Sequence, residues 1–106
     1  MNENANIAKA LSDTSRLLII EILSCGELCA CKILEKFNFS QPTLSHHMKI
    51  LCDCGLVSGR KEGKWTYYTL NAEVVNNYLS FIRKITTKSD NCICNERGVN
   101  CELCEC

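Results

Sequence analysis

Ser40-Gln41-Pro42, near the middle of the chain, marks the start of a helix and constrains the fold on both sides of it. A serine hydroxyl can accept a hydrogen bond from the free amides of a first helical turn, and proline suits that turn because its missing N–H would have no partner there. Apolar side chains then recur with helical period, and a glycine, Gly55, ends the pattern. The recurring positions are Leu44, Met48, Leu51 and Cys52.

A shorter helix comes just before this one. Its apolar side is marked by Ile33, Leu34 and Phe37, and Asn38-Phe39-Ser40 forms a tight connection to the second helix. Two helices joined by so short a turn predict a helix-turn-helix motif within residues 27–55.

The elements around the motif predict a winged helix-turn-helix. Residues 56–61 and 64–70 are rich in β-branched and aromatic side chains around Glu62-Gly63, which indicates a β-hairpin. Helices are expected over residues 5–12 and about 72–87, the latter capped by Asn71. The fold class is therefore mainly α with a β-hairpin wing.

Two of the predicted helices are unusually apolar. The helix that Ser12 or Asp13 would cap is apolar nearly all round, as in a central core helix, through Leu17, Leu18, Ile20, Ile22 and Leu23. The last helix carries a stripe wide enough for both a core and a partner subunit, formed by Val74, Val75, Tyr78, Leu79, Ile82 and Ile85. The chain is therefore expected to be a homodimer.

Charge and cysteine content divide the chain into two parts. Residues 1–88 hold 11 basic and 8 acidic side chains and are expected to form one domain, while residues 89–106 hold 1 and 4 and form a cysteine-rich tail that should be flexible without a ligand. The chain starts with no signal-peptide pattern and has no membrane-spanning run, so we expect a cytoplasmic protein with reduced thiols. Its ten cysteines then favour metal or metalloid binding.

Polar and basic side chains suggest a DNA-binding surface. Arg60, Lys61 and Lys64 cluster at the hairpin tip, where they suit phosphate contacts beside a groove. His47 lies between apolar positions and is expected to be a half-buried packing residue. Residues at the start of the second helix and off its apolar stripe suit base edges and phosphates, and an ordinary solvated face is the alternative. They are Ser40, Gln41, Thr43, Ser45, His46 and Lys49.

Cys29 and Cys31 form the first thiolate candidate, at the expected start of the shorter helix. Residues two apart in a regular helix point roughly 200° away from each other, so one ion could bind both sulfurs only if that turn opened. Ligation and an intact motif would then compete, as allosteric coupling requires. The helix start should also favour the thiolate form. Two small buried apolar side chains are the alternative.

The remaining cysteines fall into three groups. Cys52 lies on the apolar stripe and is expected in the core, whereas the pattern favours the core less clearly for Cys54. Cys25 could supply a ligand or pack at a helix end. The tail thiols have no core to pack against and favour soft ions such as Zn, Cd, Cu(I) or a trivalent metalloid, with disulfide exchange as the weaker alternative. They are Cys92, Cys94, Cys101, Cys104 and Cys106. An enzyme is not expected, because two histidines on one helix do not make a catalytic set.

These residues resemble the arsenic-repressor (ArsR/SmtB) family of winged-helix metalloregulators. The resemblance covers about residues 5–86 through LSDTSRLLIIEIL, ELCAC, SQPTLSHHMKIL and GLVSGRKEGKWTYYTL. It implies a homodimer built on the first and last helices, which binds double-stranded operator DNA, represses efflux or detoxification genes and releases DNA when the ion binds. Members with ELCxC resemble sensors of arsenite and antimonite, which bind three thiolates.

The resemblance places Cys29 and Cys31 at the first two thiolates of the arsenic site, but Leu34 stands where the third would fall. Cys25, a tail cysteine of either subunit or an external thiol could complete the site, or the ligand could be a trivalent organoarsenical with one carbon substituent. The family's zinc ligands have no match in residues 73–88. A Cd, Pb or Zn sensor using tail thiols and a thiol-rich metal buffer or carrier are the competing interpretations.

Overall fold

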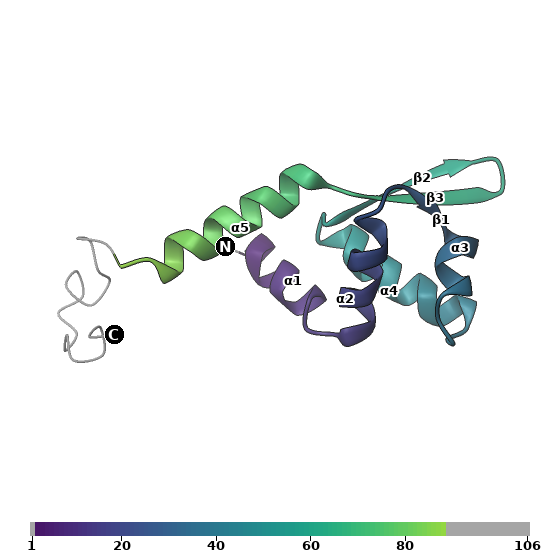
Figure 1. Cartoon of the computed structure of the whole chain (residues 1–106), viewed down its shortest axis with the longest axis horizontal. Coiled ribbons are helices and arrows are strands. Elements are labelled where there is room, and N and C mark those ends of the chain that lie inside the picture. The colour runs from purple at the N-terminus through teal and green to yellow at the C-terminus, as the bar shows by residue number, and fades with distance from the viewer. Residues whose placement is uncertain (1, 89–106) are drawn as a thin grey trace.

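The computed structural model describes residues 2–88, and the predicted tail domain, residues 89–106, lies outside them. Its element order confirms the predicted winged helix-turn-helix, with α3 and α4 as the motif and β2–β3 as the wing (Figure 1). The elements are α1 (Asn2–Ala10), α2 (Thr14–Leu23), β1 (Leu28–Cys29), α3 (Ala30–Glu35), α4 (Gln41–Asp53), β2 (Val57–Glu62), β3 (Trp65–Leu70) and α5 (Ala72–Thr86).

Side-chain caps fix the starts of three helices where the sequence predicted them. Asp13 accepts a hydrogen bond of 3.2 Å from the Arg16 amide at the start of α2. Ser40 accepts one of 3.4 Å from the third residue of α4, and Asn71 accepts one of 3.3 Å at the start of α5. Each cap satisfies an amide that the helix itself cannot pair.

The sheet has one strand more than the predicted hairpin. Strands β2 and β3 pair antiparallel from Val57↔Leu70 to Glu62↔Trp65, so Gly63 and Lys64 form the turn, with Gly63 at φ +64°. The short strand β1 then adds to the free edge of β3, in the order β1-β3-β2. The sequence did not predict β1, because a two-residue strand has no periodicity of its own.

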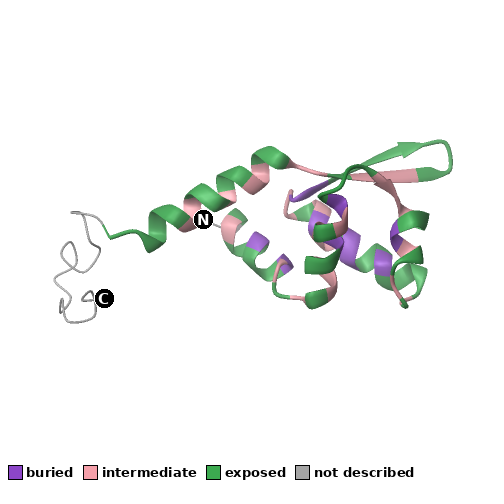
Figure 2. Ribbon diagram, viewed as in Figure 1, coloured by how far each residue is buried: buried purple, intermediate pink, exposed green. Residues whose placement is uncertain are grey.

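The core lies where α1 to α4 meet the base of the wing (Figure 2). Its largest fully buried side chains are Ile19, Ile33, Met48 and Leu51. The prediction of a helix α2 buried all round is wrong, because only Ile19 and Leu23 of this helix are buried and Leu17 and Leu18 are 48% and 45% exposed. No residue of α5 is fully buried either, and this helix extends away from the core beside α1 (Figure 1).

His47 is a packing residue, as predicted, but it is buried rather than half-buried, and it joins three helices. It is 9% exposed, and its Nδ1 lies 3.1 Å from Nη1 of Arg16. The same arginine donates from Nε to the carbonyl of Ala10 at 2.7 Å. These contacts tie α4 to α2 and to the end of α1, which holds the exposed face of α4 in a defined orientation. In residues 2–88, no helix combines the length and apolar character that crossing a bilayer requires.

Candidate thiolate site and nucleic-acid interface

Cys29 and Cys31 lie side by side where β1 runs into α3. Their Sγ atoms are 2.8 Å apart. Cys29 is both the last residue of β1 and the N-cap of α3, with φ −80° and ψ 157°, so its side chain does not follow helical spacing. The prediction that the first turn must open before both sulfurs can reach one ion is therefore wrong, because the turn begins only after Cys29.

The contact between the two sulfurs makes them chemically unequal. The hydrogen bond between the two thiols holds the pKa of Cys29 below its usual value, and the Lys32 amide acts in the same direction. That same hydrogen bond raises the pKa of Cys31. Both thiols are free, Cys29 partly and Cys31 well exposed. Cys29 is therefore the better nucleophile of the pair, since the thiolate is the reactive form.

A third ligand is not evident next to this pair. Within the described part of the chain, no three Cys, His, Asp or Glu side chains gather into a group that could hold a metal ion. Leu34 follows Cys31 by one helical turn, and Cys25 is exposed beyond the end of α2. Cys52 and Cys54 are half-buried and pack against the core. The candidates Cys92, Cys94, Cys101, Cys104 and Cys106 lie outside the described residues.

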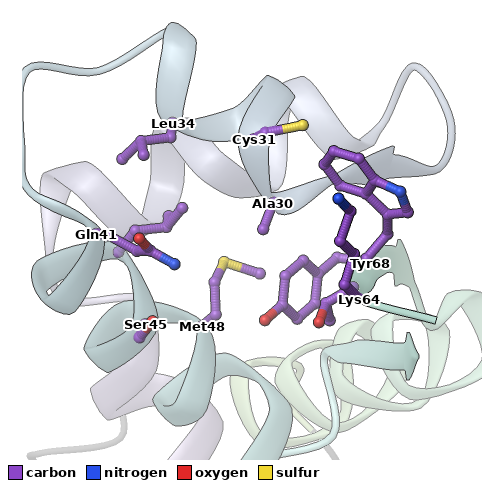
Figure 3. Close-up of a pocket in the computed structure, with 11 residues that line it drawn as sticks. Ala30, Cys31, Leu34, Gln41, Ser45, Met48, Lys64 and Tyr68 are labelled. Atoms are coloured by element: carbon purple, nitrogen blue, oxygen red, sulfur yellow. The ribbon is translucent and has the colours of Figure 1, made fainter. Parts of the chain in front are cut away.

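A cavity of about 230 Å³ lies beside Cys31, between α3, α4 and the wing. Ala30 and Cys31 line it from α3 and Met48 from α4, while Tyr68 and Lys64 line it from the wing (Figure 3). Its wall mixes apolar side chains such as Leu34 and Met48 with polar ones such as Gln41 and Ser45. The space next to the thiol pair is therefore shared by the three elements of the winged motif.

The face of α4 opposite the core carries the predicted DNA-binding side chains. Leu44, Met48 and Leu51, on the side of the helix that faces the core, are buried. The six predicted residues are all exposed: Ser40, Gln41, Thr43, Ser45, His46 and Lys49. Lys49 forms an ion pair of 3.1 Å with Asp53 one turn later, and this exposed pair is easily exchanged for another anion. Apart from Pro42, the side of α4 exposed to solvent is thus polar.

The three basic residues of the wing differ in their surroundings. Lys61 and Lys64 are exposed at the tip, and the Lys64 ammonium lies 5.6 Å from the centre of the Trp65 ring. Arg60 is held instead, by ion pairs with Glu62 and with Glu27, at 2.9 Å to the latter. This contact lowers the pKa of Glu27. Sequence reasoning missed Glu27, because its partner lies 33 residues away in the chain.

Comparison with known proteins agrees with this geometry. Residues 13–58 match the family model of bacterial regulatory proteins of the arsR family. The chain is 49% identical to an arsenical resistance operon repressor of Staphylococcus aureus over 93% of its own length and 96% of that protein, and 52% identical to one of Staphylococcus xylosus over 87% and 88%.

A solved structure supports the same assignment. The homodimeric winged helix-turn-helix DNA-binding domain of a Mycobacterium bovis protein superposes with a TM-score of 0.66 at 27% identity, over 79% of this chain and 78% of that one. Sequence, fold and motif placement agree over the same residues. The chain belongs to the ArsR family of bacterial regulatory proteins.

Proposed function

We propose that this chain is a metalloid-responsive transcriptional repressor, which binds operator DNA as a dimer in the cytoplasm and dissociates when trivalent arsenic or antimony binds Cys29 and Cys31. The observation that carries the proposal is the 2.8 Å separation of the two sulfurs inside the DNA-binding motif. The names of the two staphylococcal relatives, both arsenical resistance operon repressors, favour arsenic over other soft ions.

The ligand exchange needs no other reactant. Each thiol displaces one hydroxyl group of arsenious acid, and the thiol proton leaves with that hydroxyl as water. Two arsenic–sulfur bonds form in this way, and thiolates suit such a soft centre. The third position on arsenic keeps its hydroxyl group, or an external thiol, Cys25 or a tail cysteine replaces that group. In an organoarsenical this position carries the carbon substituent, for which the cavity beside Cys31 has room.

DNA binding would use both halves of the motif. The polar face of α4 enters a major groove, and Arg60, Lys61 and Lys64 contact phosphates beside it. Leu79 and Ile85, which are 57% and 60% exposed on α5, suit a second copy of the chain. A two-fold dimer would place two α4 helices in successive turns of the groove, and each copy would bring its own thiol pair.

The test is a fluorescence-anisotropy titration, at one stated salt concentration, with DNA from upstream of the chain's own gene and with random DNA of equal length. The protein should prefer the first by about 10³-fold or more, and arsenite should release it. Cys29→Ser and Cys31→Ser should bind DNA but resist release. Cys54→Ser is the matched control, since Cys54 lies at the C-terminal end of α4, where its thiol donates a hydrogen bond to the Leu51 carbonyl, and this variant should respond normally.

Three outcomes would count against this proposal. Normal release of both Cys29→Ser and Cys31→Ser would contradict the thiol site. Loss of every ion response on deletion of residues 90–106 would place a Cd, Pb or Zn site in the tail. Equal affinity for both DNAs would favour a thiol-rich metal buffer or carrier.

A further inference from the structure

Cys29 lies on the outer face of the wing sheet, in one cross-strand row with Tyr67 and Arg60. It pairs with Tyr67, and Tyr67 pairs with Arg60 on the other side. Directly paired residues of neighbouring strands point to the same face. The next row, which contains Leu28 and Tyr68, packs against the core. Cys29 and Arg60 therefore share the solvent face of the sheet, with Tyr67 between them.

Glu27 joins these residues by its side chain. Its Oε1 accepts from Nη2 of Arg60 at 2.9 Å, and its Oε2 accepts from the Thr69 hydroxyl at 3.2 Å. The Arg60 guanidinium also lies 4.8 Å from the centre of the Tyr67 ring. Since β1 is only two residues long, its attachment to the wing consists of two register pairs and this carboxylate.

Binding one atom to both sulfurs must move the two sulfur atoms apart. With bonds of about 2.3 Å, two sulfurs 2.8 Å apart would subtend only about 75° at that atom, less than a tetrahedral or pyramidal centre allows. Cys31 belongs to α3, which the fully buried Ile33 anchors in the core. Cys29 ends a short edge strand, so it is the sulfur that moves more easily.

We propose that Glu27 is the positioning residue that couples the thiol site to the wing. Resting on the proposed function, the inference is that ligation displaces β1, that Glu27 moves with it, and that Arg60 thereby loses the position it needs to contact a DNA phosphate. The displaced and the undisplaced β1 would then differ in their affinity for arsenite and for DNA. This difference releases the DNA, because a ligand shifts an equilibrium only by its unequal affinity for the two states.

The test compares Glu27→Gln with Glu62→Gln in the full chain. Both variants remove a carboxylate from Arg60, but only Glu27 lies next to β1, since Glu62 belongs to the same strand as Arg60. The readout is the ratio of operator dissociation constants with and without arsenite, and allosteric ratios of this kind are typically about 5 to 150. Arsenite binding is measured in a separate experiment, which follows the ultraviolet absorption of the arsenic–sulfur bonds.

Glu27→Gln should bind arsenite and operator DNA, yet its ratio should fall at least about fivefold, whereas Glu62→Gln should keep the wild-type ratio. Thr69→Val, which removes the second contact to Glu27, should lower the ratio by less. An unchanged ratio in Glu27→Gln, or an equal fall in Glu62→Gln, overturns the inference alone. If arsenite binds the wild-type protein but does not release it from operator DNA, both the proposed function and this inference are overturned.

Discussion

Replacing Leu34 with cysteine should give the thiol site a third ligand from the protein itself. Leu34 follows Cys31 by three residues in α3, a spacing that puts side chains about 5–6 Å apart on one helix face. Both residues also line the same cavity. The new thiol would therefore lie within reach of an arsenic atom already bound to Cys31.

The gain can be estimated from effective concentration. A tethered group close to its target acts at an effective concentration of roughly 1 mM. An external monothiol at about 10 µM is about 100 times less concentrated, so the new cysteine should lower the arsenite concentration needed for half-release about 100-fold. The substitution also removes part of a half-buried leucine from the edge of the core, which should cost about 1 kcal/mol of folding stability.

The assay is the arsenite titration of the operator complex, followed by anisotropy. Leu34→Ser is the matched control, because it loses the same packing and gains no thiol. It should release at the wild-type arsenite concentration. Equal midpoints for Leu34→Cys and Leu34→Ser would refute the reasoning, since they would show that arsenic is not held next to Cys31.

Three further predictions concern folding and assembly. Ile19→Ala should lower the free energy of unfolding by about 2–5 kcal/mol in urea titrations, because this side chain is fully buried; an effect below about 1 kcal/mol would contradict its central place in the core. The Arg16 amide holds the pKa of Asp13 below its usual value, so the stability that ionised Asp13 contributes is complete above about pH 4 and is lost as the pH falls through the folded-state pKa. Asp13→Asn should lack this part of the acid dependence in melting curves between about pH 6 and 2, and identical curves would exclude it. Leu79→Glu should weaken the dimer in sedimentation experiments, because it puts a charge on the exposed apolar face of α5, and an unchanged dimer would move the interface elsewhere.

Local chemistry explains which parts of the fold the sequence could predict. Asp13, Ser40 and Asn71 cap helices through hydrogen bonds to amides three residues away, so the cause lies within the same short segment. The buried stripe of α4 follows from its helical period, and the existence of the hairpin follows from its strand-forming residues, although the turn lies at Gly63 and Lys64, one residue later than predicted. These features need no information from the rest of the chain.

The features that the sequence did not predict depend on distant partners. Strand β1 exists because Leu28 and Cys29 pair with β3, about 40 residues later, and that pairing gives Cys29 the extended backbone that brings its sulfur to Cys31. The contact between Glu27 and Arg60 has the same origin. The prediction that Cys29 and Cys31 point away from each other is therefore wrong, because it placed Cys29 inside the helix.

Arsenic K-edge absorption on the full-length protein with one equivalent of arsenite tests the central claim most directly, because it counts the sulfur atoms bound to arsenic. Wild-type protein should show at least two sulfur neighbours, and Cys29→Ser and Cys31→Ser should each show one fewer. The same sulfur count in the double variant as in the wild type would contradict the assignment of the sensing site to Cys29 and Cys31.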